Sequence, residues 1–103
     1  MPSTTHIPIG SDDRPRLVRH VRLTFDPARG RHVLLSPETV VVLNPTGAAI
    51  LELCDGQRTV AGIVAELRAR YDRVVEEDVL RFLDGLVARR CVEAVREVGR
   101  DDG

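Results

Sequence analysis

The sequence predicts an α+β fold in which a three-stranded antiparallel sheet is followed by a bundle of three helices. The main observation is a change in hydrophobic period, from two residues in the first half to 3.6 residues in the second. Turn signals separate the strand-like segments, and a cap-forming residue precedes each of the first two helical segments. The chain has 103 residues, 43% hydrophobic and 30% charged, which suits a single domain with one core.

The predicted domain covers residues 14–96. Residues 1–13 are polar, contain prolines and a glycine, and show no periodicity, so we expect a flexible N-terminal tail. Residues 97–103 are expected to form a flexible C-terminal tail for the same reason.

Three segments are predicted to be strands. Residues 17–25 alternate between apolar and polar positions, which is typical of a half-buried strand. A turn containing Pro27 and Gly30 separates them from residues 32–36, so the two segments are expected to form a hairpin. After a second turn, residues 39–43 are β-branched and apolar on both faces. The predicted inward face of the first strand consists of Leu17, Val21, Leu23 and Phe25.

Three helices are predicted after these strands. The first begins at Asn44, a good N-cap that a proline follows, and ends at a glycine signal, Gly56. The second follows Thr59, another N-cap residue. The third spans residues 76–90, with acidic residues in its first turn and arginines in its last, as the helix dipole favours. Residues 91–95 alternate again, which is compatible with a short final strand. The apolar stripe of the second helix consists of Val60, Ile63, Val64, Leu67 and Tyr71.

The third strand and the third helix carry more apolar surface than one core requires. Val40 and Val42 are predicted to point away from Val41 and Leu43. Apolar side chains of the third helix sweep about 160° around its axis. We therefore expect this surface to be covered by a binding partner, by a second copy of the chain, or by the C-terminal strand.

Charge argues against a general nucleic-acid binder. The 15 basic and 16 acidic residues give a formal charge of −1, whereas such a protein needs a basic surplus. Strands that lead into three short helices also suggest a winged-helix arrangement, in which the third helix would read the DNA major groove. That helix carries four acidic residues and three arginines. The basic residues concentrate instead in residues 14–31, with six arginines and one aspartate.

The sequence contains no catalytic pattern. Cys54 and Cys91 lie far apart in apolar surroundings, which predicts two buried thiols and neither a disulfide nor a metal site. The serines lie in predicted tails or turns, without a nucleophile elbow. We expect a protein that is not an enzyme and holds no cofactor. No apolar run is long enough to span a membrane and no signal pattern begins the chain, so we expect a cytoplasmic protein.

Residues 34–86 contain a series of motifs at defined spacing. The first are Leu34-Leu35-Ser36-Pro37-Glu38, Leu43-Asn44 and Ile50-Leu51-Glu52-Leu53-Cys54-Asp55-Gly56. The helical part reads Thr59-Val60-x-x-Ile63-Val64-x-x-Leu67 and Asp78-Val79-x-x-Phe82-Leu83-x-x-Leu86. Together they resemble the pyrroloquinoline quinone (PQQ) biosynthesis protein D family, small peptide chaperones that serve as recognition elements for ribosomally made, modified peptides.

The resemblance implies a winged-helix-like peptide-recognition domain. Members of the family bind the PQQ precursor peptide and present it to a radical S-adenosylmethionine (SAM) enzyme, which cross-links a Glu and a Tyr of that peptide. We expect a monomer or weak homodimer, with no nucleic-acid or membrane partner. Two alternatives stay open, namely recognition of a different modified peptide and DNA binding by a winged helix.

The resemblance also implies where the peptide binds. The peptide would add a strand beside residues 39–43, and its side chains would enter a groove against the third helix. Arg19 and Arg22 of the basic hairpin are expected to dock the partner enzyme. The expected peptide-binding residues are Thr39, Val40, Val41, Val42 and Leu43 of the strand, and Val79, Leu80, Leu83, Leu86 and Val87 of the helix.

Overall fold

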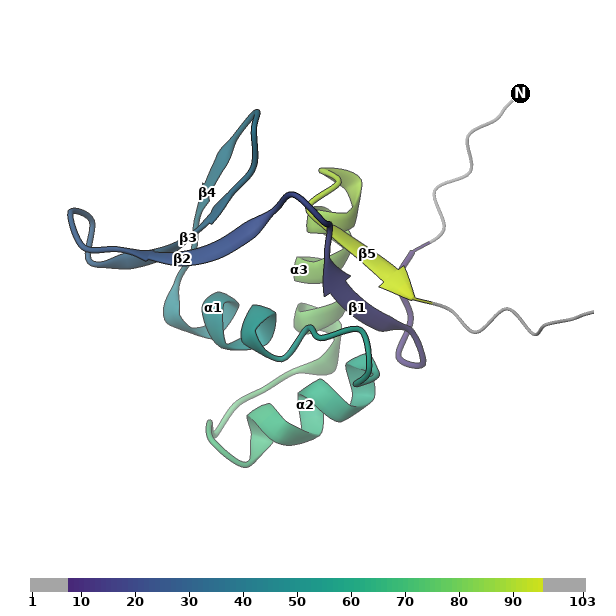
Figure 1. Ribbon diagram of the computed structural model, residues 1–103. Coiled ribbons are helices and arrows are strands. Elements are labelled where there is room, and N and C mark those ends of the chain that lie inside the picture. The colour runs from purple at the N-terminus through teal and green to yellow at the C-terminus, as the bar shows by residue number, and fades with distance from the viewer. Residues whose placement is uncertain (1–7, 96–103) are drawn as a thin grey trace, which may run out of the picture.

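The computed structural model describes residues 8–95, which form a mixed α/β domain with antiparallel sheets (Figure 1). No helix within these residues is long and apolar enough to cross a membrane. The elements, in chain order, are β1 (Arg14–Leu17), β2 (Arg22–Asp26), β3 (Arg31–Leu35), β4 (Val40–Val42), α1 (Pro45–Glu52), α2 (Val60–Arg68), α3 (Glu76–Ala88) and β5 (Val92–Val95).

The predicted three-stranded antiparallel sheet is present, with the strand order β2-β3-β4. β2 and β3 form a hairpin in which Arg22 lies opposite Leu35. The turn of this hairpin is closed by Gly30, whose φ of 67° is readily adopted by glycine. β4 pairs with β3 so that Val42 lies opposite Val33. Both β2 and β4 are therefore edge strands within the described part of the chain.

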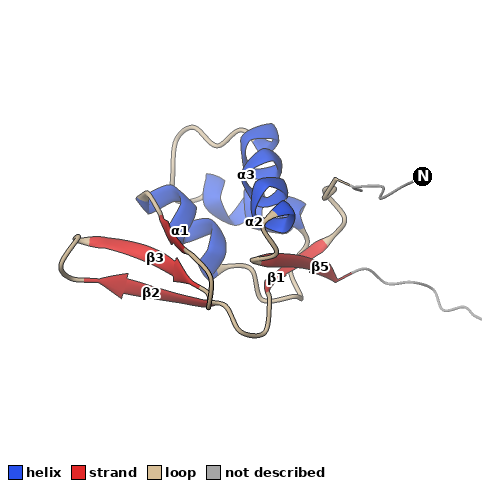
Figure 2. Cartoon of the chain, turned by 90° about the horizontal axis from the view of Figure 1, so that it is seen from above, coloured by secondary structure: helices blue, strands red, loops and turns tan. Residues whose placement is uncertain are grey.

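The prediction of one strand over residues 17–25 is wrong. A turn interrupts it, in which the Val21 N–H donates to the Val18 carbonyl at 2.9 Å. The residues before this turn belong to β1, which pairs with β5 in a second, two-stranded sheet. Figure 2 shows the two sheets side by side, with the helices on one side of both. β5 follows α3, where the sequence is compatible with a short final strand, so the strands do not all precede the helices.

The helices begin at the predicted caps. The Asn44 side chain accepts a hydrogen bond from the Gly47 N–H at 2.7 Å, and Pro45 is the first residue of α1. Thr59 caps α2 in the same way through the Gly62 N–H, at 3.1 Å. α3 begins at the predicted residue, with three acidic side chains in its first turn. Local sequence signals therefore place each helix start.

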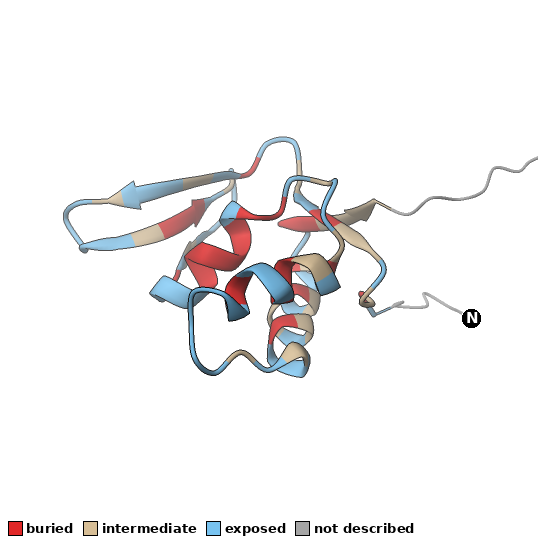
Figure 3. Cartoon of the chain, turned by 90° about the horizontal axis from the view of Figure 1, so that it is seen from below, coloured by how far each residue is buried: buried red, intermediate tan, exposed pale blue. Residues whose placement is uncertain are grey.

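The core lies between the sheets and the helices, where the buried residues gather (Figure 3). Ile63, Leu67 and Leu83 are completely buried at its centre and join α2 to α3. Two predicted core positions are wrong, because Phe25 is 50% exposed and Tyr71 is 39% exposed. The Phe25 ring instead meets the His32 ring edge-on across the hairpin, with 5.1 Å between the ring centroids.

The predicted N-terminal tail differs from the structure over residues 8–13. Ile9 is buried, and its N–H donates to the Asp84 carboxylate of α3 at 3.2 Å. The carbonyls of Ser11 and Asp13 accept from the backbone at the start of α2. This segment is anchored by long-range contacts that its polar composition does not reveal. The rest of that predicted tail, residues 1–7, and the predicted C-terminal tail lie outside the described residues.

Ile9→Ala tests this packing. The substitution removes a buried aliphatic side chain, so we expect the free energy of unfolding to fall by about 2–3 kcal/mol in a urea titration. Val75→Ala, at a position 51% exposed, is the control and should change it by less than about 0.5 kcal/mol. Equal, small effects of the two substitutions would show that residue 9 adds nothing to the core.

Candidate functional site

The backbone of β4 has hydrogen-bonding groups at the free edge of the sheet that no strand among residues 8–95 uses. The Leu43 N–H donates to the His32 carbonyl at 2.9 Å, and the Ser36 N–H donates to the Thr39 carbonyl at 3.0 Å. Bonded and non-bonded pairs alternate along an antiparallel ladder. The N–H and C=O groups of Val40 and Val42 therefore face away from β3, toward the open edge.

The side chains of β4 divide between two faces, as the sequence predicts. Val40 and Val42 are 50% and 47% exposed, whereas Val41 is half-buried and packs against the core. Leu43 follows the strand and is buried, and Thr39 precedes it and is exposed. An apolar strand with an open edge and two exposed valines is an aggregation hazard unless a partner covers it.

The five residues expected from α3 divide into a buried and a half-buried set. Val79, Leu83 and Leu86 belong to the core, so they support the surface from beneath and do not line it. Leu80 and Val87 are half-buried, at the margin of the core. The broad apolar sweep of this helix is thus mostly explained by its packing against α2 and β5.

Phe82 is a candidate binding residue that the sequence analysis does not select. Its side chain is half-buried and lies so close to Gly47 that a Cβ on that glycine would be 3.1 Å from the ring. It lines a cavity of about 180 Å³ between the start of α1 and the first half of α3. The signal for it was its position three residues after Val79 and four before Leu86, on the same helical face.

A second cavity lies where the chain turns from β3 into β4. Its volume is about 320 Å³, and Ser36, Pro37 and Glu38 of the turn face Arg89 and Arg90 at the end of α3 across it. The start of β4 is thus next to the end of α3, and the residue that follows β4, Asn44, is next to the first half of α3. β4 and α3 run in opposite directions (Figure 1). We call the surface between these two cavities the β4–α3 surface.

A larger cavity of about 540 Å³ lies on the other side of the hairpin. Phe25 and His32 of the hairpin, Ala49 of α1 and Tyr71 after α2 contribute to its lining. It does not include a residue of β4 or α3, so the open backbone groups of Val40 and Val42 do not reach it. The volume of a cavity alone therefore does not identify the candidate binding site.

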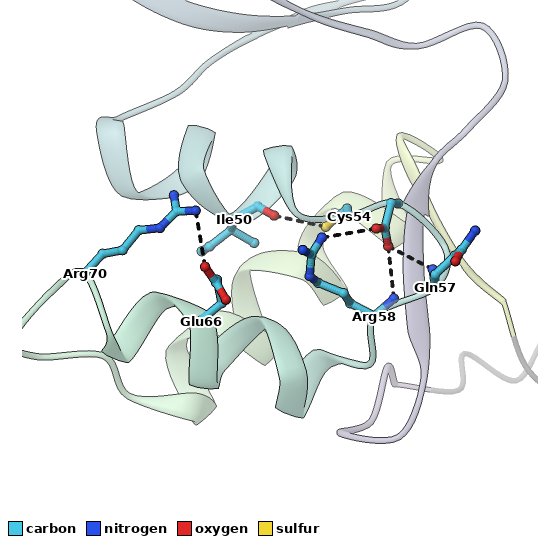
Figure 4. Close-up of polar contacts among 7 residues, drawn as sticks. Ile50, Cys54, Gln57, Arg58, Glu66 and Arg70 are labelled. Atoms are coloured by element: carbon cyan, nitrogen blue, oxygen red, sulfur yellow. Dashed lines mark hydrogen bonds and ion pairs between the residues drawn. The ribbon is translucent and has the colours of Figure 1, made fainter.

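Two titratable groups with clearly shifted pKa values lie in the connection between α1 and α2 (Figure 4). Burial, with a smaller contribution from the Asp55 charge, raises the pKa of the Cys54 thiol to about 12. Its Sγ donates to the Ile50 carbonyl at 3.3 Å. Cys91 is also buried and free, as predicted. A protonated, enclosed thiol such as Cys54 is a packing group rather than a nucleophile at neutral pH.

Asp55 organises this connection. Its carboxylate accepts from the backbone N–H groups of Arg58 and Gln57, each at 2.9 Å, and pairs with the Arg58 guanidinium (Figure 4). The N–H of Arg58, followed by that of Gln57, lowers the pKa of the Asp55 carboxyl. The next residue, Gly56, has a φ of 79° and donates to the Pro15 carbonyl, which links the connection to β1.

The two arginines expected to dock a partner enzyme lie at the same end of the sheet as the β3–β4 turn, but on the side of β2, the opposite edge from β4. Arg19 lies in the turn between β1 and β2, and Arg22 begins β2 opposite Leu35. Both are exposed. They are separate in sequence from the residues of β4 and α3, and the structure places them outside the two cavities that bound the β4–α3 surface.

Comparison with known proteins identifies the family. The profile of the family described as coenzyme PQQ synthesis protein D (PqqD) matches residues 31–92. The chain belongs to the PqqD family. A PqqA binding protein of Pseudomonas aeruginosa is 46% identical over 84 residues, which cover 80% of this chain and 91% of that protein. A bifunctional coenzyme PQQ synthesis protein C/D of Methylorubrum extorquens is 44% identical over 79% of this chain and 23% of that protein.

Solved structures place PqqD-family proteins in the same fold. The solution NMR structure of the PqqD truncation of Methylobacterium extorquens PqqCD matches with a TM-score of 0.73 and 42% identity, over 82% of this chain and 94% of that chain. That protein is described as a functional, stand-alone recognition element for ribosomally synthesised and post-translationally modified peptides. The heterocyclase TruD matches with a TM-score of 0.61 at 20% identity, over 86% of this chain and 12% of that chain, and shows the fold alone.

Asp55→Ala tests the role of the α1–α2 connection. A folded-state pKa below the unfolded value of 3.8 means that the ionised carboxylate stabilises the fold above that pH. This contribution is lost as the pH falls through the lowered pKa. We therefore expect Asp55→Ala to lower Tm at pH 7, and we expect the difference from the wild-type protein to shrink as the pH falls below 3.8 and through the lowered pKa.

Asp55→Asn is the matched control, because an amide oxygen still accepts from both N–H groups while the charge is lost. Its Tm at neutral pH should lie between those of the wild-type protein and Asp55→Ala. A Tm difference for Asp55→Ala that is the same at neutral and acid pH would contradict the assignment.

Proposed function

We propose that this protein binds the PQQ precursor peptide PqqA as an additional strand beside β4. The observation that carries the proposal is the open edge of β4, where the backbone groups of Val40 and Val42 have no partner strand within the described residues. The relatives that are named PqqA binding proteins supply the identity of the peptide. An extended peptide that pairs with an exposed strand gains affinity from main-chain hydrogen bonds.

We propose a role for each part of the β4–α3 surface. Backbone groups of Val40 and Val42 bond to the peptide, and every second peptide side chain then points toward α3. Phe82 offers a partly exposed apolar contact on that side. Val87 instead lines a cavity with Ile9 and Val92, and Leu80, seven residues before it, shares that helical face. Among the remaining expected residues, Val41 packs against the core and Thr39 precedes β4 at the turn. The others are buried in the core beneath the surface, namely Leu43, Val79, Leu83 and Leu86.

In this function the protein presents the peptide to the partner radical SAM enzyme, which cross-links a Glu and a Tyr of the peptide. The chain itself is a binder without catalytic residues, and it needs no cofactor or metal ion. We propose that it works in the cytoplasm as a monomer or weak homodimer with a winged-helix-like domain. Arg19 and Arg22 are proposed to contact the enzyme, because they are exposed and lie off the β4–α3 surface.

The two alternative functions, recognition of another modified peptide and DNA binding, require different binding surfaces. A recognition element for another modified peptide would use the same strand edge, and only the sequence of the bound peptide would differ. A DNA-binding winged helix would have to insert α3 into the major groove, yet the first turn of α3 is occupied by Glu76, Glu77 and Asp78. Repulsion between these carboxylates and the phosphates disfavours that mode of binding.

NMR titration with synthetic PqqA peptide tests the binding site. We expect the largest amide shifts in β4 and along α3, and shifts confined to the β2–β3 hairpin would contradict the proposal. Val42→Pro removes an N–H that β3 does not use, so the fold should persist. Loss of this outward donor should weaken peptide binding at least about tenfold.

Phe25→Pro is the matched control for this experiment. The backbone groups of Val33 and Leu35 point toward β2, where these residues lie opposite Thr24 and Arg22. Because bonded and non-bonded pairs alternate, the N–H of Phe25 points toward the open edge of β2. This variant should bind the peptide as tightly as the wild-type protein does. Equal weakening by the two proline substitutions would show that the peptide does not select the β4 edge.

The double variant Arg19→Glu with Arg22→Glu tests enzyme docking. Reversing two exposed charges should weaken binding to the partner radical SAM enzyme about tenfold or more in a pull-down or calorimetric measurement, with unchanged affinity for the peptide. Arg81→Glu, on α3, is the control charge reversal. An unchanged affinity of the double variant for the enzyme would exclude this docking site.

A further inference from the structure

The end of α3 holds an arginine in a backbone conformation that favours glycine. Arg90 has a φ of 64°, and the other positive-φ residues within the described chain are glycines, at positions 30 and 56. The N–H of Arg90 donates to the Val87 carbonyl and the N–H of Cys91 donates to the Leu86 carbonyl, each at 2.9 Å. This pattern is the Schellman motif, whose left-handed position is usually a glycine.

The Schellman hydrogen bonds are made by backbone groups, so they do not require a side chain at position 90. A side chain in the left-handed region is strained, and such strain tends to be kept where the side chain serves a function. Arg90 is exposed and forms no side-chain hydrogen bond or ion pair within the described residues. The same is true of Arg89, although most other described arginines of the helical half are paired, for example Arg58, Arg70 and Arg81.

The position of Arg89 and Arg90 relates them to the β4–α3 surface. Both line the cavity at the β3–β4 turn, beside the start of β4, and Arg90 also lines a cavity with Ile9 and Val92. His20 and Glu38 also line it, so two guanidinium groups face one carboxylate there. The cavity at the other end contains one arginine, Arg73, and one acidic residue, Asp78. The surface is therefore positive at the turn end and balanced at the other end.

We propose that Arg89 and Arg90 bind carboxylate side chains of the peptide where it passes the β3–β4 turn. The inference rests on the proposed function and deepens it, because it specifies the charge of the recognised segment at one end. The strands of this sheet pair antiparallel, and a peptide that continues this order has its C-terminal end at the turn. The proposal therefore puts the acidic residues of the peptide on the C-terminal side of the paired segment. Guanidinium groups suit this role because they bind carboxylates in a fixed, bidentate geometry.

Arg90→Gly separates a binding role from a structural role. Glycine relieves the backbone strain, so the Tm should be unchanged or higher than that of the wild-type protein. The Kd for synthetic PqqA peptide, measured by calorimetry with the full chain, should nevertheless rise about fivefold. The double variant Arg89→Gln with Arg90→Gly should raise it further and should bind with a weaker dependence on salt concentration.

Arg81→Gln is the matched control, because Arg81 lies on the same helix and is 77% exposed but lines neither cavity. It should leave the Kd unchanged. In a second arm, acidic residues of the peptide are replaced one at a time by their amides. At least one replacement should be non-additive with Arg90→Gly, which identifies the carboxylate that the arginine contacts.

The outcomes separate the inference from the proposed function. Wild-type protein that does not bind the peptide contradicts both. Binding that persists unchanged in the double arginine variant overturns only the inference, as does an equal loss in Arg81→Gln. A clear fall in Tm for Arg90→Gly would also overturn it, because the arginine would then be needed for the fold.

Discussion

The half-satisfied backbone of β4 is the constraint on which the rest of the structure depends. Pairing with β3 uses the hydrogen-bonding groups of alternate residues and leaves those of Val40 and Val42 directed outward. No described strand covers them. The neighbouring elements are arranged so that this edge stays accessible, with α3 beside it and a cavity at each end. A binding site can thus be built from main-chain groups, with little need for reactive side chains.

α3 contributes both to the hydrophobic core and to the β4–α3 surface. Its buried face, centred on Leu83, fixes the helix against α2 and β5, while Phe82 and the end of the helix border the β4–α3 surface. The end of the helix is fixed by the Schellman hydrogen bonds and by the chain entering β5 directly afterwards. Because β5 pairs with β1, the position of Arg90 depends on contacts between the two ends of the domain. The second sheet therefore supports the site without lining it.

Sequence reasoning succeeded where the signal is local. The caps at Asn44 and Thr59, the hairpin turn at Gly30 and the outward direction of Val40 and Val42 were all predictable, because each depends on neighbouring residues. It failed where distant segments meet. The alternation of residues 17–25 continues through a turn, and nothing in the local pattern indicates that β1 pairs with β5. The burial of Ile9 depends in the same way on α3, which lies far along the chain.

The sequence by itself determined the fold class, the helix starts, the two buried thiols and an excess of apolar surface on the third strand and third helix. Only the tertiary structure decided which apolar residues of α3 belong to the core and which border the surface. Hydrophobic periodicity identifies the apolar face of a helix, but it does not identify the element that packs against that face. It also decided the charge of the site. Arg89 and Arg90 suit the dipole of any helix end, and only the tertiary structure brings them next to the turn from which β4 starts.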